Sequence, residues 1–216
     1  MEKQALFGVC GALLALSLVL TGCPTEANDS PPSGKIGEKT LTLKGTVYTV
    51  SNSTTFTKAG AAYDGEVDGK PGGSGKITKG EFTFSVEPLD VSSGPTLNAA
   101  ALSVLIPTIG LYTDVTVSPD VKYAVLLLDP DSGAILEHKN SAAGSDSVKT
   151  ERVTYIYLSG AVKITGKKSS GTSGKLDLSL VKGWNIIYEK NEVKASLTSS
   201  SSVKVEKHSL KWVITP

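Results

Sequence analysis

Few side chains in this sequence are of the types that perform covalent or metal chemistry. Its 216 residues include two cysteines, Cys10 and Cys23, and two histidines, His138 and His208. The histidines are far apart and have no cysteine or third histidine beside them, so they do not form a zinc motif. The sequence also lacks the G-x-S-x-G string of a nucleophile elbow. We therefore predict no catalytic and no metal site; an enzyme would need one histidine to meet a serine or carboxylate in a cleft.

Cys23 has the most specific surroundings of these residues. It follows an apolar run over residues 5–20 and two small residues, Thr21 and Gly22. The run comes after a short, weakly positive start and is shorter than the ~20 residues that a membrane-spanning helix needs. These three parts together are typical of a secretory signal that is removed from the mature protein.

The four residues Leu20-Thr21-Gly22-Cys23 resemble the lipobox of bacterial lipoproteins. The resemblance implies that signal peptidase II cuts before Cys23, that its thiol forms a thioether to diacylglycerol, and that the new amino group is acylated. Two or more acyl chains would attach the chain stably to a membrane, its first predicted partner. Pro24 stands where an aspartate often retains such proteins at the inner membrane, so the resemblance favours the outer membrane. Apart from this covalent lipid we expect no cofactor.

The signal defines the first of three predicted regions. Residues 1–22 are the lipoprotein signal peptide, residues 23–38 are the lipidated cysteine with a flexible tether, and residues 39–216 are a single β-domain. The tether contains prolines, glycines and polar residues and almost no apolar side chain that could offset the entropy lost on ordering. Loss of Cys10 with the signal and lipidation of Cys23 leave no cysteine for a disulfide.

Charge is spread unevenly along the chain. Residues 23–147 carry 9 lysines and 15 acidic residues, a net charge of −6, whereas residues 148–216 carry 12 basic and 5 acidic residues, a net charge of +7. The basic part could face anionic lipid headgroups or acidic glycans. Alternatively, acidic and basic strands pair within one sheet, which we favour. Arg152 is the only arginine, and this scarcity argues against nucleic acid as a partner.

Alternation of apolar and polar residues predicts an all-β fold. Over residues 41–50, Leu41, Leu43 and Val47 share one face, as in a half-buried strand. Further strand-like segments are 76–86, 121–128, 152–158, 161–165, 175–181, 184–189, 193–198, 203–206 and 209–215, separated by turn-like pairs such as Lys190-Asn191 and by loops such as 199–202. We expect an antiparallel β-sandwich or partly open barrel of roughly ten strands. A short helix is expected near 97–105, although its dense apolar residues also fit a buried strand.

Three polar strings imitate ligand sites but fit ordinary loops and strands better. Residues 69–75 lack the spacing of a phosphate loop and the Ser or Thr that would bind magnesium. Residues 129–133 begin like a calcium loop, but their aspartate, proline and glycine are typical of a turn, and the glutamate ligand is missing. Asp64, Glu66 and Asp68 alternate on one side of a strand-like segment, where charge protects a sheet edge.

Four aromatic residues are the candidate ligand contacts. Tyr155 and Tyr157 share one face of a predicted strand, and Trp184 and Tyr188 share one face of another. If exposed, such a strip could stack on sugar rings or hold an apolar ligand. If buried, it is sheet core with cross-strand pairs, which is the interpretation we favour.

Taken together, these features predict a non-catalytic binding or structural module of the bacterial cell envelope. It would be held at the outer membrane by its lipid and would have a protein or glycan partner that the sequence does not identify. The alternative is a lipocalin-like carrier of a small apolar ligand. A carrier would enclose a cavity of about 300 Å³ or more where a binding module has a filled core.

Overall fold

The computed structural model describes residues 34–52, 55–58, 65–70, 72–130, 135–143, 147–169, 175–194, 199–207 and 210–215. All of them belong to the unit Pro31–Pro216. The described part contains sixteen strands, one α-helix and one 3-10 helix, which confirms the all-β prediction, although the strands are more numerous than the roughly ten expected. The strands are β1 (Lys35–Gly37), β2 (Leu41–Asn52), β3 (Thr55–Lys58), β4 (Gly65–Lys70), β5 (Ser74–Thr78), β6 (Glu81–Val86), β7 (Tyr112–Ser118), β8 (Tyr123–Val125), β9 (Leu127–Pro130), β10 (Ile135–Ala143), β11 (Ser147–Leu158), β12 (Val162–Lys168), β13 (Lys175–Leu180), β14 (Gly183–Lys194), β15 (Ser199–Lys204) and β16 (Trp212–Thr215). The helices are α1 (Ala99–Leu105) and η1 (Pro107–Leu111).

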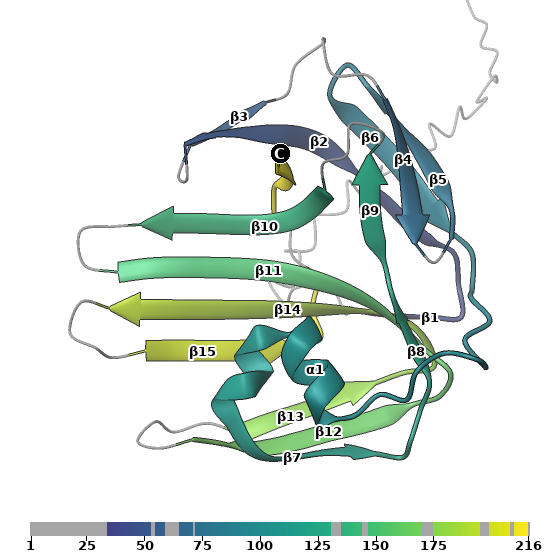
Figure 1. The fold of residues 1–216 in the computed structure, drawn as a ribbon, viewed down its shortest axis with the longest axis vertical. Coiled ribbons are helices and arrows are strands. Elements are labelled where there is room, and N and C mark those ends of the chain that lie inside the picture. The colour runs from purple at the N-terminus through teal and green to yellow at the C-terminus, as the bar shows by residue number, and fades with distance from the viewer. Residues whose placement is uncertain are drawn as a thin grey trace, which may run out of the picture. The chain divides into compact units, whose positions relative to one another are not determined.

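The strands form two sheets (Figure 1). The larger has thirteen strands, and its path runs β1-β14-β11-β10-β16-β2-β6-β5-β4-β9, with β15, β3 and β8 paired to β14, β2 and β11. The smaller has the order β13-β12-β7. The larger sheet curls until β9 meets β10 again at Leu128 and Leu136, yet the fold is a sandwich and not a closed barrel. In the described part all strand pairs are antiparallel except β16 and β2, which run parallel with Trp212 beside Val47.

The central strands β11 and β14 of the larger sheet have a core on each face. They pair along their whole length, from Ser147 opposite Lys194 to Leu158 opposite Gly183. Because side chains alternate along a strand, each strand sends every second residue to either face of the sheet. Both faces are covered, so residues 183–189 of β14 are all buried.

The first core lies between the central strands and the curled part of the sheet. β2 and β6 pair from Leu41 opposite Val86 to Thr46 opposite Glu81, and they send their apolar side chains inward. The buried members of this core are Leu41, Leu43, Val47, Ile77, Phe82, Phe84, Val86, Val91, Leu126, Leu128, Val153, Tyr155, Tyr157, Trp184, Ile186, Tyr188 and Trp212. These side chains pack between the central strands and the curled part of the sheet.

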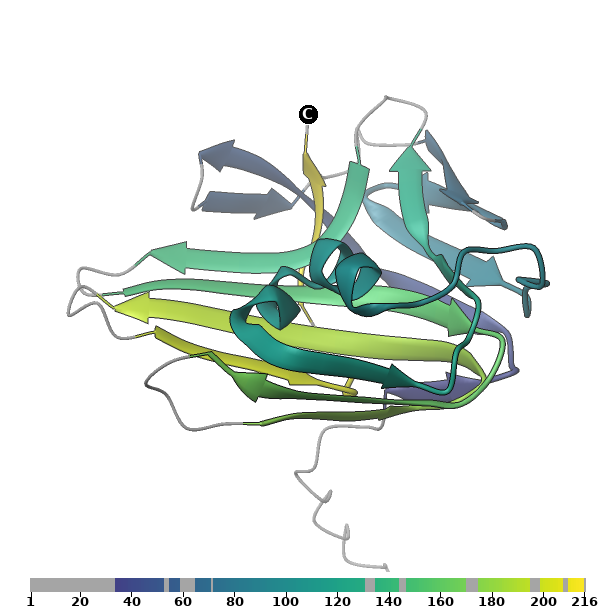
Figure 2. The same cartoon turned by 60° about the horizontal axis from the view of Figure 1, so that its bottom comes forward.

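The second core lies on the opposite face of the central strands. The small sheet and α1 cover it, and Figure 2 shows the small sheet lying beside β14 and β15. The buried members of this core are Leu97, Leu102, Ile106, Ile109, Val121, Ile156, Leu158, Val162, Ile164, Leu176, Leu178, Leu180, Ile187 and Val203. Burial of each large aliphatic side chain contributes about 1.5–3 kcal/mol, so this apolar contact holds the small sheet against the large one.

Helix α1 confirms the short helix expected near 97–105. Asn98 caps its start, since the side-chain oxygen accepts a hydrogen bond from the Ala101 N–H at 2.8 Å. Leu102 faces the second core and is fully buried. The helix stops just before Pro107, whose ring cannot continue the helical hydrogen bonds, and η1 begins there instead.

The last part of the tether predicted over residues 23–38 belongs instead to the fold, since residues 34–37 join the sheet. β1 pairs with β14, and the backbone N–H and C=O of Gly34 are both hydrogen-bonded to neighbouring segments. Gly183 has a φ of +90°, and a Cβ on it would lie 2.1 Å from the carbonyl carbon of Gly37. In the sequence, Gly34 and Gly37 belong to the segment predicted to be flexible. In the fold they let two backbones approach each other closely.

Two of the breaks predicted in the C-terminal half are wrong. The sequence indicates a turn at Lys190-Asn191, but β14 continues through both residues because β11 and β15 pair with them on either side. Residues 199–202, expected as a serine-rich loop, begin β15 for the same reason. Tertiary pairing thus overrides the local preference of these polar residues.

Two segments that the sequence presents as single stretches are each divided. Residues 121–128 contain β8 and the start of β9, because β8 pairs with β11 whereas β9 pairs with β4. Residues 76–86 contain a hairpin, in which Lys79 and Gly80 have φ values of 51° and 74°. Two successive positive φ angles are the geometry of a type I′ turn, which joins β5 to β6.

Candidate ligand-binding cavity

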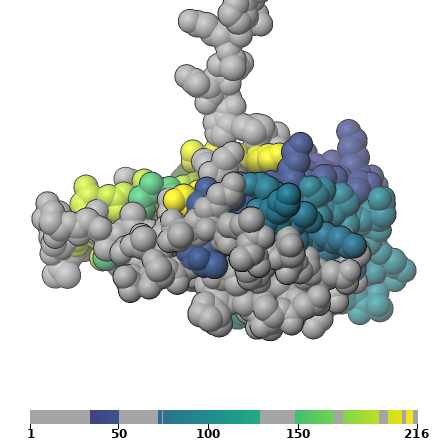
Figure 3. Space-filling model, turned by 90° about the horizontal axis from the view of Figure 1, so that it is seen from above, coloured from purple at the N-terminus to yellow at the C-terminus, as the bar shows by residue number. Residues whose placement is uncertain are grey.

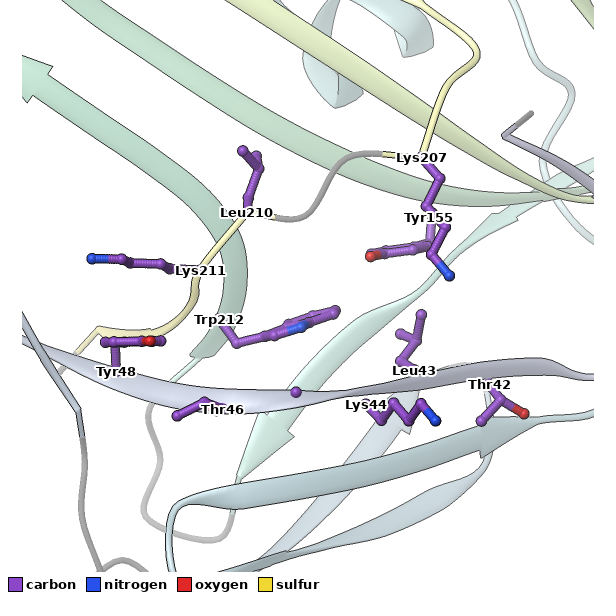
Figure 4. Close-up of a pocket in the computed structure, with 11 residues that line it drawn as sticks. Thr42, Leu43, Lys44, Thr46, Tyr48, Tyr155, Lys207, Leu210, Lys211 and Trp212 are labelled. Atoms are coloured by element: carbon purple, nitrogen blue, oxygen red, sulfur yellow. The ribbon is translucent and has the colours of Figure 1, made fainter. Parts of the chain in front are cut away.

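A cavity of about 380 Å³ lies where the C-terminal segment crosses β2 (Figure 4). Its walls come from residues 42–46 and 48 of β2, from Tyr155 of β11, and from residues 207 and 210–212, which lead into β16. The parallel pairing of β16 with β2 brings these distant segments together. In Figure 3, residues from near the C-terminus (yellow) reach the surface next to N-terminal ones (purple).

Trp212 borders the cavity and is held by three neighbours. Its ring stacks on that of Tyr155, with centroids 5.9 Å and planes 10° apart. The ring of Phe82 meets it edge-on, with centroids 4.8 Å apart. On β2, Gly45 leaves room for the indole, because a Cβ there would lie 2.8 Å from Trp212 Cδ1. Trp212 is only 6% exposed, so it shapes the wall of the cavity more than it offers an open ring face.

Three lysines make the cavity basic. Lys44 and Lys207 lie toward one end, and Lys211 lies toward the other with its Nζ 4.9 Å from the centre of the Tyr48 ring. Among the described residues that line the cavity, none is acidic. A concave surface with ammonium groups on several sides attracts anions, so this lining favours a negatively charged ligand.

Hydroxyl groups add neutral polar contacts to the lining. Thr42 Oγ1 lies 3.2 Å from Ser85 Oγ, and Thr46 Oγ1 donates a hydrogen bond to the Glu81 carboxylate at 2.9 Å. Burial raises the pKa of the Tyr155 phenol, which therefore stays protonated at neutral pH. The cavity thus offers positive charge, hydroxyls and aromatic edges within a small volume.

Comparison with known proteins adds no template for this site. No family model matches the chain, and neither a curated protein nor a solved structure matches it. Among the described residues, no helix is long and apolar enough to cross a membrane. In the same residues, no three His, Cys, Asp or Glu side chains gather where they could share a metal ion. The cavity and the N-terminal motif are therefore the features from which function can be inferred.

The structure buries all four aromatic residues that the sequence offers as ligand contacts. Tyr157 and Trp184 meet edge-on in the first core, with ring centroids 5.2 Å apart and exposed fractions of 3% and 0%. Tyr188 is buried in the same core. An exposed aromatic strip is therefore absent from these positions, and the sheet-core interpretation holds. Only Tyr155 also borders the cavity, so a ligand contact remains a prediction for this residue alone.

The lysines of the cavity are functional candidates that the sequence does not bring together. Lys44 lies on β2, whereas Lys207 and Lys211 come from the end of the chain. The net positive charge of residues 148–216 is the only sequence signal that points toward them. Their convergence with Lys44 depends on the long-range pairing of β16 with β2, which no local pattern encodes.

Several residues singled out in the sequence lie outside the described residues. These include Cys23 with its predicted lipid, as well as His208 and Asp64. His138 is on β10 and Asp68 is on β4, where the structure describes the backbone and not the side chains. The predicted lipidation of Cys23 therefore stays a prediction.

A charged group at the margin of the first core has a well-defined environment. Glu151 accepts a hydrogen bond from the Tyr188 hydroxyl at 2.6 Å and pairs with Lys149 Nζ at 2.8 Å. Burial tends to raise the pKa of Glu151, but the contacts with Lys149 and Tyr188 outweigh it and hold this pKa below its usual range. Burial and the same hydrogen bond raise the pKa of Tyr188. This arrangement explains how the hydroxyl of a core tyrosine is satisfied.

Proposed function

We propose that this protein is a lipid-anchored, non-catalytic module of the bacterial outer membrane that binds an acidic glycan in its basic cavity. The observation that carries the ligand class is the lining by Lys44, Lys207 and Lys211. The Leu20-Thr21-Gly22-Cys23 motif supports the anchor and the location. Membrane and glycan are thus the two partners, and the proposal involves neither nucleic acid nor a cofactor.

The chemistry of the lining suits a charged sugar. Lysine carries a point charge on a flexible stem, which can follow carboxylate, sulfate or phosphate groups at several positions on a polymer. The threonine hydroxyls and the protonated Tyr155 phenol can exchange hydrogen bonds with sugar hydroxyls. The ring of Tyr48, over which Lys211 lies, offers an apolar surface at the same place.

The position of β1 limits how far the domain would lie from its lipid. Gly34, the first residue that the structure describes, is hydrogen-bonded to the sheet. The residues between Cys23 and Gly34 can span at most about 40 Å when fully extended. A domain on this length of tether would stay close to the headgroups and to the glycans attached near them.

The anchor is tested on the full-length protein expressed in a bacterium. We expect the native chain to lack residues 1–22, to carry diacylglycerol on Cys23 by mass spectrometry, and to partition into the detergent phase. Cys23→Ala removes the thiol that would carry the lipid, so this variant should remain in the aqueous phase or stay unprocessed. An intact Met1 on the native protein, or unchanged partitioning of Cys23→Ala, would show that the lipid assignment is wrong.

Glycan binding is tested with polygalacturonate as an anionic probe and dextran as a neutral one. The full-length protein in detergent should bind polygalacturonate, and binding should weaken as salt screens the charges. Lys44→Gln with Lys207→Gln should lower the affinity at least tenfold. The control pair is Lys163→Gln with Lys167→Gln, whose side chains are 60% and 77% exposed on β12 and which should bind as wild type does. Equal loss in both pairs would mean that general charge, and not the cavity, attracts the probe.

A second candidate function is the carriage of a small apolar ligand. A separate cavity of about 600 Å³ is lined mainly by apolar residues, among them Leu89, Val91, Leu105 and Val125. Its volume is in the range of sites for drug-sized ligands. A fluorescent apolar probe that is displaced by fatty acids, and whose signal falls when Leu105 is replaced by Glu, would favour this alternative.

A further inference from the structure

A polar cluster lies on the second-core face of the central strands, apart from the basic cavity. The strand register places Thr150 opposite Asn191 and Arg152 opposite Glu189. Side chains directly opposite each other on paired strands share a face, so these four form two neighbouring rows. Residues of η1 cover them and complete a cavity of about 250 Å³.

Glu189 is the most unusual member of this cluster, because its carboxylate is buried. The residue is 5% exposed. Its Oε2 accepts a hydrogen bond from the Thr108 N–H at 3.2 Å, which attaches η1 to β14. Its Oε1 has no hydrogen-bond donor, and Arg152 Nε lies 3.8 Å away. One carboxylate oxygen therefore has a structural role, and the other is available for another donor.

Several buried oxygen atoms without a hydrogen-bond partner lie on the strands around Glu189. Buried polar side-chain atoms without a hydrogen-bond partner include Thr154 Oγ1, Glu189 Oε1, Asn191 Oδ1 and Ser201 Oγ. All four residues lie on adjacent strands β11, β14 and β15. Buried polar atoms in proteins nearly always have partners. Of these four residues, Glu189 and Asn191 line the cavity, and their unpaired oxygens are acceptors. They suit a group that donates several hydrogen bonds, and an ammonium group donates three.

Arg152 adds the opposite charge at the edge of the same cavity. It is the only arginine of the chain, its side chain is 43% exposed, and its contact with Glu189 involves Nε. A guanidinium that is approached through Nε still has terminal nitrogens with which it can bind a carboxylate in bidentate fashion. A simple cation entering the cavity would meet Arg152, and a simple anion would meet Glu189. A ligand that carries both charges would satisfy both residues.

We propose that this cavity binds a free α-amino acid with an apolar side chain. The α-ammonium group donates hydrogen bonds to Glu189 Oε1 and Asn191 Oδ1, and the α-carboxylate binds Arg152. The amine nitrogen and carboxyl carbon of an amino acid are about 2.5 Å apart, so its two charges can reach two adjacent groups such as Arg152 and Glu189, which lie 3.8 Å apart before Arg152 rotates. Rotation of the partly exposed Arg152 side chain opens the path to the covered Oε1.

The size and rim of the cavity support this ligand class. A volume of about 250 Å³ is below the roughly 300–1,000 Å³ of sites for drug-sized ligands. Pro107 and Leu111 border the cavity and provide an apolar surface for the side chain of the amino acid. This inference uses none of the residues of the basic cavity and does not depend on the glycan proposal.

Calorimetric titration of the full-length protein in detergent tests the proposal with three ligands of similar shape. L-Leucine carries both charges, isoamylamine only the ammonium group, and 4-methylpentanoate only the carboxylate. We expect leucine to bind at least tenfold more tightly than either analogue. Glu189→Gln and Arg152→Met should each lower the affinity for leucine at least tenfold. The control Lys163→Met removes an exposed charge on β12, which lies outside the cavity, and should bind leucine as wild type does.

Thermal unfolding of each variant separates loss of binding from loss of the fold. If Glu189→Gln does not fold, Arg152→Met decides, because its side chain is partly exposed. Equal affinity for leucine and the two analogues would overturn the proposal, as would wild-type affinity in Arg152→Met. Absence of binding at about 10 mM leucine would also overturn it and would mean that the cluster holds water only.

Discussion

Glu151 shows how a single charged residue can contribute to the stability of this fold. It accepts a hydrogen bond from Tyr188 and pairs with Lys149, and together these contacts hold its pKa below the ordinary value. A carboxylate with a lowered pKa stabilises the fold in its charged form. This stabilisation is present above the ordinary pKa of about 4.3 and is lost as the pH falls through the lower pKa of the folded state.

We therefore predict a pH-dependent effect of Glu151→Gln. At pH 7 the variant should lose about 1.5 kcal/mol of unfolding free energy, the lower end of the range for hydrogen bonds to charged groups. The difference from wild type should shrink toward zero near pH 2, where Glu151 is protonated in both folded and unfolded chains. Urea unfolding of both proteins at several pH values measures it.

Glu192→Gln is the matched control for this measurement. Its carboxylate pairs with Lys190 at 3.3 Å, and both side chains are more exposed than that of Glu151. An exposed pair contributes little, so the control should lose less stability at pH 7 than Glu151→Gln does. A loss of stability in Glu151→Gln that is the same at pH 2 and pH 7 would contradict the assignment.

The site contains residues whose burial the sequence predicts and residues whose convergence it does not. The burial of Tyr157, Trp184 and Tyr188 follows from their alternation on strands with apolar neighbours, and the sheet-core interpretation anticipates it. The cavity does not follow in this way. Lys44 and Lys207 come to line one cavity only when β16 pairs with β2, and two segments from opposite ends of the chain have no local signal for this pairing.

Local sequence signals predict a secondary-structure element correctly where the element makes its own hydrogen bonds. Helix α1 is an example, because Asn98 supplies a cap and Pro107 marks the end of the helical segment. Strands depend instead on partners elsewhere in the chain. The pair Lys190-Asn191 is typical of a turn when taken alone, yet β11 and β15 keep it extended. The same dependence explains why residues 34–37 join the sheet.

The Asn98 cap of α1, the helix that covers the second core, should contribute to the stability of the fold. Asn98→Ala removes the acceptor of the Ala101 N–H and should cost about 1 kcal/mol of unfolding free energy. Asn98→Asp retains an acceptor and should cost less. Val104→Ala, at a position that is 76% exposed on the same helix, should change stability by less than about 0.5 kcal/mol. Chemical denaturation compares the three variants, and equal effects of Asn98→Ala and Val104→Ala would show that the cap contributes nothing.

At the scale of the whole described fold, the two cores share one pair of strands. β11 and β14 carry first-core residues on one face and second-core residues on the other, and neither core is complete without them. Neighbouring residues of β14 show the division, since Ile186 belongs to the first core and Ile187 to the second. Loss of either core would expose one face of the same strands, so the two cores should unfold together.

This coupling predicts the outcome of two adjacent substitutions. Ile186 and Ile187 are 2% and 0% exposed, and replacement of either by alanine should cost about 2–5 kcal/mol. Each variant should still unfold in a single calorimetric transition, shifted to lower temperature, because damage to one core destabilises strands that the other core needs. Val193→Ala on the same strand, at a position that is 45% exposed, should shift the transition only slightly. Two separate transitions in either isoleucine variant would mean that the cores are independent units, joined by β11 and β14 without being stabilised by each other.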